Sequence, residues 1–335
     1  MSYKPALYGD GVRWGLVHAD ALDLFAELPP NSVDVVLTDP PYAIDFANEA
    51  WDGVDIRRVA AEGGGRLSAG EAFARWTQTW AAECQRLLRP GGHLLAFGAP
   101  RTAHRLVCGV EDAGLEVRDM LAWLYATGVP KSRRLPGGLA TGLKPAYEPI
   151  LLARAPFSGR VADNLIQWGT GALNIDVARI GAAGFWPANV VLSHAAGCSK
   201  RRCVRDCPAR LVDAARPDKP PSRLFFSAKA TRREREAGCE QLPQRSAQLY
   251  RGRPGRRVRN IHPTVKPIGL MRHLVRLVCP PGGVVLDPFT GSGSTGAATM
   301  LEGRQFLGIE REAEYVRVAR ARLAYWARVA ARSTR

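Results

Sequence analysis

The chain has 335 residues, of which 46% are hydrophobic, and a formal net charge of +16 at pH 7. That length and apolar content suffice for one large α/β core with an insertion. The sequence shows no apolar N-terminal segment of the signal-peptide type and no apolar run of membrane-spanning length. We therefore expect a soluble, cytoplasmic protein, which argues against a secreted or membrane protein. The strong positive charge suits a polyanionic partner.

Hydrophobic patterns predict seven strands interleaved with helices. In chain order the strands are expected at residues 13–18, 33–38, 93–98, 117–125, 149–153, 284–287 and 305–310, with helices at 68–88, 99–113 and 313–331. The last helix is amphipathic and rich in alanine and arginine, which is typical of a helix that covers a sheet. This alternation predicts an α/β fold with a doubly wound, mostly parallel sheet, which binds ligands at the carboxyl ends of its strands.

The strand at 33–38 runs directly into Asp39-Pro40-Pro41-Tyr42. Each proline fixes φ and restricts the residue before it, which keeps the backbone extended. The Asp39 carboxylate and the Pro40 carbonyl then offer two neighbouring acceptors, which suit the two donors of an exocyclic amino group. Tyr42 adds a flat face on which a base can stack. These four residues are the predicted catalytic set, and the alternative is a strand end with an ordinary Pro-Pro turn.

A glycine-rich turn follows the strand at 284–287, in the sequence DPFTGSGSTG from Asp287 to Gly296. Its glycines allow a ligand to approach the backbone closely, next to the free N–H groups at the start of a helix. The strand at 305–310 ends at Glu310, where a ribose diol would need an acceptor. Two buried strands with an acidic end are the structural alternative.

These motifs together resemble the amino-group DNA methyltransferases of the beta class, including phage-type members, in which the Asp-Pro-Pro-Tyr motif precedes the target-recognition region and the cofactor motif lies near the C-terminus. The resemblance covers most of residues 14–325 and is weakest at 184–260. It rests on the motifs above and on His18-Ala19-Asp20, Arg86-Leu87-Leu88-Arg89-Pro90-Gly91-Gly92 and His262-Pro263-Thr264-Val265-Lys266-Pro267. It implies a circularly permuted, Rossmann-like class I methyltransferase fold. The corresponding division is a catalytic half at 1–127, a target-recognition region at 128–260 and a cofactor-binding half at 261–335.

The resemblance also implies S-adenosylmethionine as the cofactor, double-stranded DNA as the substrate and the cytoplasm of a bacterial or phage-infected cell as the location. It assigns Glu310 to the ribose hydroxyls of the cofactor and Asp20 to the adenine edge. It places the remaining cofactor-binding residues around the methionine moiety: Thr264, Lys266, Asp287, Phe289, Gly291 and Gly293. For Lys266 we expect a pair with a carboxylate, and an exposed contact to a DNA phosphate is the alternative. Two protein partners, a second copy of the chain and a cognate restriction endonuclease, are left open.

The implied reaction is direct methyl transfer to a flipped-out base that stacks on Tyr42. Asp at the first motif position favours N6 of adenine, whereas N4 of cytosine is the alternative. An NAD-dependent dehydrogenase would account for the glycine motif but leaves Asp39 to Tyr42 without a use. A DNA-binding relative without turnover is a further alternative. We expect His262 to be structural, Trp51 to cover the cofactor or the base, and Glu148 to cap a strand or pair with an arginine.

The predicted recognition region contains most of the positive charge. Residues 200–259 hold 18 Lys and Arg against 6 Asp and Glu, a surplus of 12 within the total of +16. We therefore expect phosphate contacts mainly in this stretch, with a solvated basic loop as the alternative. His194, Cys198, Cys203 and Cys207 have the spacing H-x3-C-x4-C-x3-C, which predicts a structural zinc site. The alternative is a set of free cysteines in a loop, and the odd total of seven cysteines argues against a complete disulfide framework.

Overall fold

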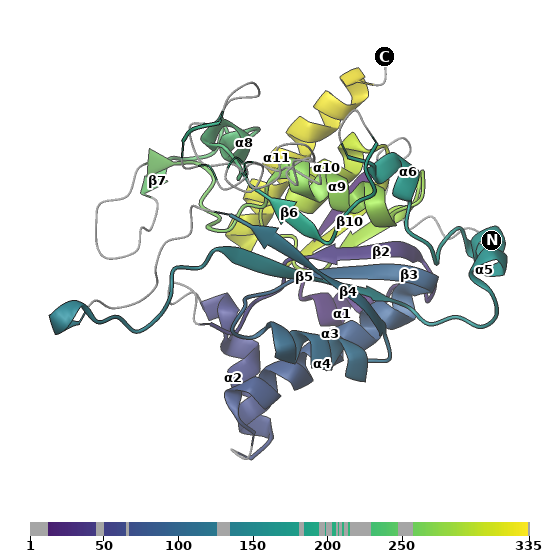
Figure 1. Cartoon of the computed structure of the whole chain (residues 1–335), viewed down its shortest axis with the longest axis horizontal. Helices are drawn as coiled ribbons and strands as arrows, with labels where there is room; N and C mark the ends of the chain where they lie inside the picture. Colours follow the sequence, from purple (N-terminus) through teal and green to yellow (C-terminus); the bar gives the residue numbers. More distant parts are fainter. Residues whose placement is uncertain are drawn as a thin grey trace.

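The fold is built on an eight-stranded sheet with the strand order β1-β10-β9-β2-β3-β5-β4-β6 (Figure 1). The computed structural model describes residues 13–44, 50–64, 67–125, 135–180, 184–193, 198, 203–205, 207, 210, 214, 229–246 and 257–333. All neighbouring strands in the sheet pair in parallel except at β5, which is antiparallel to both β3 and β4. The predicted α/β class and mostly parallel sheet are confirmed.

Most predicted strands have nearly the expected bounds. The eight strands are β1 (Trp14–His18), β2 (Val33–Thr38), β3 (Leu88–Phe97), β4 (Glu116–Leu124), β5 (Tyr147–Arg154), β6 (Val190–Leu192), β9 (Val284–Asp287) and β10 (Gln305–Glu310). The prediction of seven strands was one short, because the three residues of β6 are too few to form a recognisable pattern. β3 also starts five residues before the expected position, since the chain passes directly from a helix into this strand.

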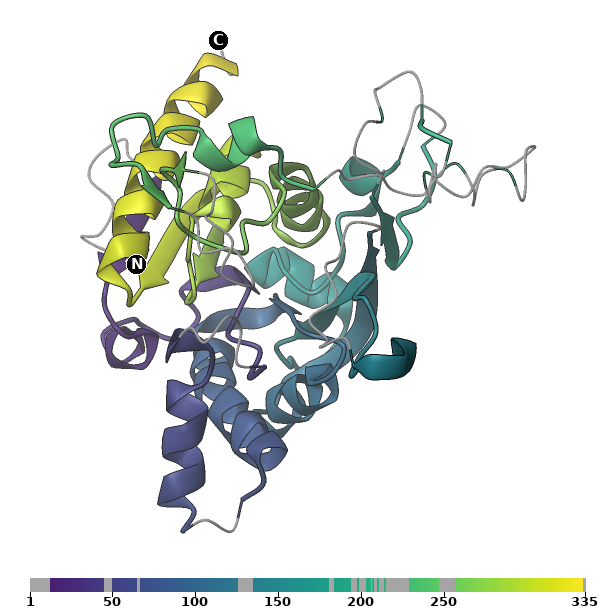
Figure 2. The same ribbon diagram turned by 90° about the vertical axis from the view of Figure 1, so that its left-hand side faces the viewer.

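Helices cover both faces of the sheet (Figures 1 and 2). One face carries α1 (Ala21–Phe25), α2 (Val54–Glu62), α3 (Ala69–Leu87) and α4 (Ala103–Asp112). The opposite face carries α6 (Ile175–Ala178), α9 (Ile268–Val278) and α10 (Ser294–Leu301), and the long α11 (Ala313–Ser333) packs beside α10 against β1 and β10. α4 begins later than predicted because Pro100 precedes it and the intervening residues form a turn.

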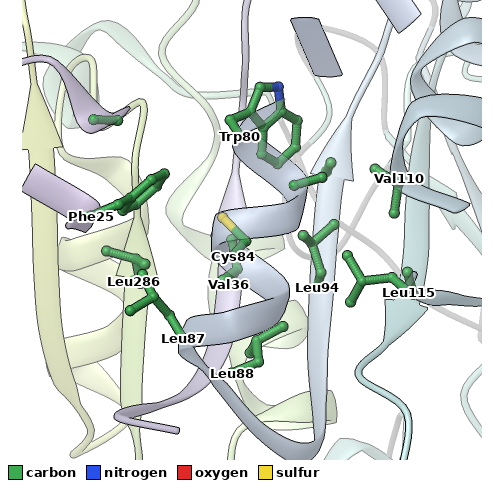
Figure 3. Packing of buried hydrophobic residues seen from close by; sticks show 14 of the residues in the cluster. Phe25, Val36, Trp80, Cys84, Leu87, Leu88, Leu94, Val110, Leu115 and Leu286 are labelled. Atoms are coloured by element: carbon green, nitrogen blue, oxygen red, sulfur yellow. The ribbon is translucent and has the colours of Figure 1, made fainter. Parts of the chain in front are cut away.

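The sheet residues alternate between two hydrophobic clusters. Val36 of β2 lies among α3 side chains such as Trp80 and Cys84 (Figure 3), whereas Val35 and Leu37 belong to the cluster with α9. All six residues of β2 are buried, as expected for a strand covered on both faces. Burying one large apolar side chain contributes about 1.5–3 kcal/mol, so these layers hold the strand ends in fixed positions.

Several short elements lie outside the main sheet and the helices that cover it. They are the helices α5 (Val161–Trp168) and α8 (Arg232–Glu236), the 3-10 turns η2 (Ala50–Asp52) and η3 (Pro136–Gly138), and the two-stranded ribbon of β7 (Arg245–Ser246) and β8 (Arg257–Val258). Within the described ranges, no helix combines the length and apolarity needed to cross a bilayer.

Candidate active site

One large cavity lies at the carboxyl ends of four neighbouring strands. Asp20 follows β1, Asp39 follows β2, and Asp287 and Glu310 are the last residues of β9 and β10; all four line this cavity. Including its open mouth, the cavity encloses about 1190 Å³. The four carboxylates that were predicted to meet at this edge of the sheet therefore lie around one cavity.

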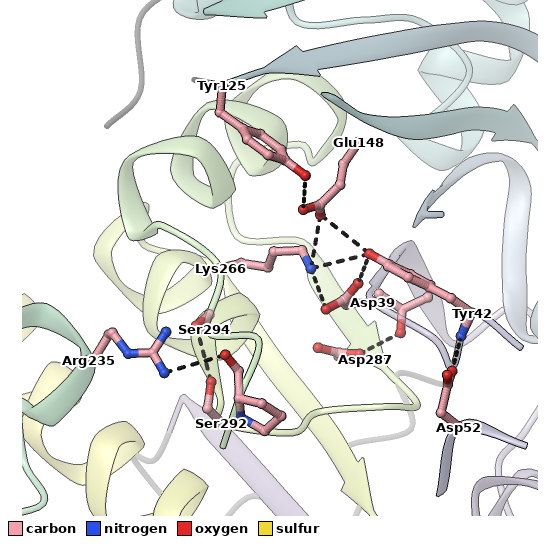
Figure 4. Close-up of polar contacts among 12 residues, drawn as sticks. Asp39, Tyr42, Asp52, Tyr125, Glu148, Arg235, Lys266, Asp287, Ser292 and Ser294 are labelled. Atoms are coloured by element: carbon pink, nitrogen blue, oxygen red, sulfur yellow. Dashed lines mark hydrogen bonds and ion pairs between the residues drawn. The ribbon is translucent and has the colours of Figure 1, made fainter. Parts of the chain in front are cut away.

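Asp39 is at the centre of a buried polar network (Figure 4). Tyr42 Oη donates a hydrogen bond of 2.5 Å to Asp39 Oδ1, and Lys266 Nζ donates one of 2.5 Å to Asp39 Oδ2. The Lys266 side chain is only 7% exposed. The Lys266 ammonium thus binds the Asp39 carboxylate, which was predicted from the sequence to accept the amino group of a base.

A second carboxylate, Glu148, approaches the same ammonium from β5 (Figure 4). Its Oε2 lies 3.3 Å from Lys266 Nζ and 3.4 Å from Tyr42 Oη, and its Oε1 accepts a hydrogen bond of 3.1 Å from Tyr125. Because β5 runs antiparallel, its first residues lie where the parallel strands end. Glu148, expected to cap a strand or to pair with an arginine, instead pairs with a lysine inside the site.

Burial and charge set the protonation of this network. Burial raises the pKa of Asp39 and the nearby Glu148 adds to the rise, while Lys266 opposes it. Burial lowers the pKa of Lys266, but Asp39 and Glu148 outweigh that effect and raise the pKa above its ordinary value. Lys266 is therefore a cation at pH 7, and Asp39 takes up a proton more readily than an exposed aspartate would.

Asp52 fixes the backbone of the catalytic motif. Its Oδ1 accepts hydrogen bonds from the N–H groups of Tyr42 at 2.7 Å and Ala43 at 3.1 Å, and its Oδ2 accepts one from Ile44 at 3.1 Å. Ala43 has a φ of 56°, a left-handed conformation that costs a non-glycine residue about 1–3 kcal/mol. The Asp52 carboxylate thus stabilises a strained turn, a role that the sequence did not indicate.

Asp287 is held by hydroxyl and backbone donors. Thr38 Oγ1 donates a hydrogen bond of 2.7 Å to Asp287 Oδ1, which also accepts one of 3.2 Å from the N–H of Phe289. Burial raises the pKa of Asp287 to about 7, although hydrogen bonds from Thr295, Thr38 and Phe289 oppose the shift. Pairing with a ligand cation would favour the ionised form.

The glycine-rich turn lies between Glu310 and α11. Glu310 Oε2 accepts a hydrogen bond of 2.7 Å from the N–H of Gly291, and Oε1 accepts one of 2.7 Å from Glu312. Gly291 has a φ of 53°, and a Cβ there would lie 2.5 Å from the His262 ring. From the other side, the fully buried Arg322 of α11 donates a hydrogen bond of 2.5 Å to the Ser292 carbonyl. α11, expected only to cover the sheet, therefore also supports this turn.

The segment that carries Lys266 is held by α8. Arg235 Nη2 donates a hydrogen bond of 3.0 Å to the His262 carbonyl, and Glu234 Oε1 accepts one of 2.5 Å from the N–H of Ile268. Burial lowers the pKa of His262 to about 3, so this residue is neutral at pH 7. Its ring lies edge-to-face on Tyr315, with the centroids 4.6 Å apart.

The remaining predicted site residues differ in their placement. Asp20 lines the cavity, but its Oδ1 caps α1 by accepting a hydrogen bond of 3.0 Å from Leu22. Phe289 packs against Trp76 and Trp80, with centroids 5.6 Å away in both cases. Of the predicted site residues, those that line the cavity are Asp20, Asp39, Pro41, Tyr42, Thr264, Lys266, Asp287, Phe289, Gly291 and Glu310. Pro40 and Gly293 do not line it; Gly293 is the N-cap of α10, where a Cβ would lie 3.2 Å from Leu323.

Of the four predicted metal ligands, His194 lies outside the described residues. The structure brings the other three together, because the sulfur atoms of Cys198, Cys203 and Cys207 all lie within 4.8 Å of one another. None of the three forms a disulfide.

Comparison with known proteins agrees with this geometry. A family model described as DNA methylase, of the N6/N4 methyltransferase type, matches residues 33–321. The chain is 23% identical over 349 residues to the type II methyltransferase M.HindIII of Haemophilus influenzae, covering 92% of this chain and 94% of that protein. It is 24% identical over 325 residues to the DNA adenine methyltransferase YhdJ of Escherichia coli, covering 96% and 85%.

Solved structures share the fold. The PvuII DNA methyltransferase, described as cytosine-N4-specific, superposes with a TM-score of 0.56 at 16% identity, covering 96% of this chain and 92% of that one. A DNA modification methylase from Thermus thermophilus, TTHA0409, gives a TM-score of 0.50 at 20% identity, covering 93% and 94%. The family match spans most of the chain and includes both the Asp39 motif and the glycine-rich turn. The chain therefore belongs to the DNA methylase family, the methyltransferases that act on the amino groups of adenine or cytosine in DNA.

Proposed function

We propose that the protein methylates the exocyclic N6 of adenine in double-stranded DNA, with S-adenosylmethionine as the methyl donor. The observation that carries the proposal is the partly buried Asp39 carboxylate, which lies beside Tyr42 and lines a cavity that is also lined by Asp287 and Glu310. A methyl acceptor and a nucleoside cofactor would thus meet at one edge of the sheet.

The choice of adenine rests on the first motif residue and on one relative. Asp39 is the residue type that favours adenine in the family resemblance, and the Escherichia coli relative is named a DNA adenine methyltransferase. The PvuII enzyme has the same fold and is described as cytosine-N4-specific, so the fold alone does not discriminate. N4 of cytosine is therefore the competing target.

The residues around the cavity fit the proposed cofactor. Asp287 would pair with the amino group of the methionine moiety, and Glu310 would accept from the ribose hydroxyls. Gly291 lets the His262 ring lie against the turn at the edge of the cavity, because a Cβ there would lie 2.5 Å from that ring. His262 Nδ1, which has no hydrogen-bond partner among the described residues, would find one in the ligand. The bound cofactor supplies an electrophilic methyl group on a sulfonium.

Asp39 acts on the amino group in this proposal. Its carboxylate accepts an amino hydrogen, which localises the nitrogen lone pair on the side facing the methyl donor. The Pro40 carbonyl, predicted to accept the second hydrogen, does not line the cavity. The methylated nitrogen must then lose a proton, and Asp39 is suited to receive it because burial raises its pKa. Tyr42 keeps the Asp39 carboxylate oriented and stacks on the base.

Binding of the base requires the Lys266 ammonium to move from Asp39 to Glu148. The Lys266 ammonium donates to Asp39 Oδ2, at the position where an amino hydrogen would bind. When the base enters, the ammonium shifts onto Glu148, 3.3 Å away, and so remains paired. Without Glu148 the shift would leave the buried cation without a carboxylate partner, which is unfavourable.

The basic stretch at 200–259 would hold the DNA phosphates, in agreement with the division into a catalytic half at 1–127, a recognition region at 128–260 and a cofactor-binding half at 261–335. Binding through phosphates predicts an affinity that falls steeply with salt.

The test is methyl incorporation from labelled S-adenosylmethionine into unmethylated genomic DNA, followed by mass spectrometry of the nucleosides. N6-methyladenine is the expected product. N4-methylcytosine would replace the proposed target with the competing one, and tight DNA binding without incorporation would refute the enzymatic proposal. Cys108→Ser, on an exposed position of α4, is the control variant and should retain full activity.

A further inference from the structure

The three clustered cysteines lie on a segment that methyl transfer does not use. Ser193 follows the edge strand β6, and the chain returns at Lys229, so residues 194–228 form a long connection between these two points. A connection of this length usually has structure of its own or a function, because ordering it costs conformational entropy.

Both ends of this segment are fixed at the same place. Trp123 Nε1 donates a hydrogen bond of 2.8 Å to Ser193 Oγ, and Lys229 Nζ lies 5.8 Å from the Trp123 ring and 3.5 Å from the Tyr125 ring. Tyr125 in turn donates to Glu148 in the active-site network. The segment therefore leaves and re-enters the fold beside the site of methyl transfer.

The cysteine sulfurs converge within this segment. Cys198, Cys203 and Cys207 have all three sulfur atoms within 4.8 Å of one another, without a disulfide. Tetrahedral zinc with Zn–S bonds of about 2.3 Å separates its sulfurs by about 3.8 Å, so only a small adjustment is required. A polynuclear iron–sulfur cluster places its cysteines on different irons and would spread the sulfurs farther apart.

Local contacts also suit metal-bound thiolates. The backbone N–H of Val204 points at Cys198 Sγ, 3.4 Å away, and the Cys207 N–H closes a turn onto the Val204 carbonyl at 3.2 Å. Cys207 is fully buried although the sequence around it is strongly basic.

We infer that Cys198, Cys203 and Cys207 bind a structural zinc ion that orders the basic segment next to the active site. The metal takes the place of a hydrophobic core that a segment so rich in arginine cannot form. The fourth ligand is a solvent molecule or a residue outside the described ranges, and His194 is the one that the sequence spacing predicts.

The first test is the metal content of the purified full-length protein after exhaustive dialysis, measured by inductively coupled plasma mass spectrometry. We expect about one zinc per chain, a more than tenfold loss in Cys203→Ser, and full retention in the control Cys108→Ser. His194→Ala should lower zinc retention if the histidine is the fourth ligand, and should leave it unchanged if that ligand is solvent. Absence of stoichiometric zinc, equal zinc in Cys203→Ser, or iron in place of zinc would overturn the inference.

A second measurement needs no variant that might fail to fold. Wild-type protein is alkylated with and without a zinc chelator, and the modified cysteines are identified by mass spectrometry. Cys198 and Cys203 should react at least tenfold faster after chelation, whereas Cys108 should react at the same rate in both samples. Equal rates for all three would contradict a metal site.

The consequence for DNA binding rests on the proposed function and is measured separately. Chelation should weaken DNA affinity at least tenfold while S-adenosylmethionine affinity stays within about twofold, because the cofactor residues lie on other elements. If zinc is present but its removal leaves the DNA affinity unchanged, the metal site stands and its role in DNA binding is refuted. If no DNA binding is found at all, the proposed function fails, but the metal result stands.

Discussion

The two sides of the active site hold their carboxylates by different means. On the acceptor side, Asp39 and Glu148 share one side-chain partner, the Lys266 ammonium. On the cofactor side, Asp287 and Glu310 accept hydrogen bonds mainly from the backbone and from Thr38, groups that cannot leave. The difference indicates an exchangeable partner where a substrate must displace it, and a fixed frame where a cofactor binds repeatedly in one pose.

The largest loss of activity should come from Asp39→Asn, on the acceptor side. The variant keeps the shape but loses the anionic acceptor, so we expect kcat to fall about 10²- to 10⁴-fold. The affinity for S-adenosylmethionine, measured by equilibrium dialysis, should stay within about twofold because the cofactor frame is untouched. A kcat close to that of wild type would contradict the role of Asp39.

Glu310→Ala, on the cofactor side, should weaken binding of S-adenosylmethionine. It removes charge-assisted hydrogen bonds that contribute about 1.5–3 kcal/mol, so cofactor affinity should fall about 10- to 100-fold. Titration calorimetry measures this loss, and kcat at saturating cofactor should change far less. A variant in which kcat falls and cofactor affinity is unaltered would show that the two sides are not separate in the way described.

Glu148→Gln tests the exchange of the ammonium group. With one carboxylate fewer, Lys266 should remain on Asp39 and compete with the base, which lowers kcat/KM for DNA about tenfold, equivalent to about 1.4 kcal/mol. The matched control is Glu116→Gln, which breaks a pair with Arg154 at the opposite end of β4 and β5. Equal effects of the two substitutions on kcat/KM would reduce Glu148 to a structural residue.

The smallest expected effect is a pH dependence of cofactor binding. Burial raises the pKa of Asp287 from 3.8 to about 7, so the free protein loses stability as the pH rises through that window and the buried carboxyl ionises. A cofactor ammonium pairs only with the ionised form, and its affinity should rise up to about tenfold between about pH 6 and pH 8. Asp287→Asn should flatten the profile; an unchanged slope in that variant would assign the titration to another group.

The frame of the fold was predictable because its strands are buried on both faces. Residues 33–38, 284–287 and 305–310 have the bounds of β2, β9 and β10, since continuous apolar runs give a strong local signal. α9 was not predicted, although it is apolar over most of its length, because such a run does not distinguish a buried helix from a strand. The short strand β6 forms by pairing with its neighbour β4 and has no local signal.

The same reasoning applies to the site. Asp39, Asp287 and Glu310 were expected to meet because parallel strands end at a common edge. Glu148 lies there only because β5 runs in the opposite direction, which is a property of the sheet and not of the residues around position 148. Asp52 and Arg322 stabilise the two ligand-facing turns through contacts across long loops or between distant elements, and composition does not reveal such partners.

The strand order has a consequence for how the chain is made. β1 and β2 are consecutive in the sequence, but β10 and β9 lie between them in the sheet. During synthesis the first two strands therefore emerge with an unfilled gap between them, and the sheet is completed only when residues 284–310 follow. Until then the edges of β1 and β2 are open to pairing with other chains, which favours aggregation of the nascent protein.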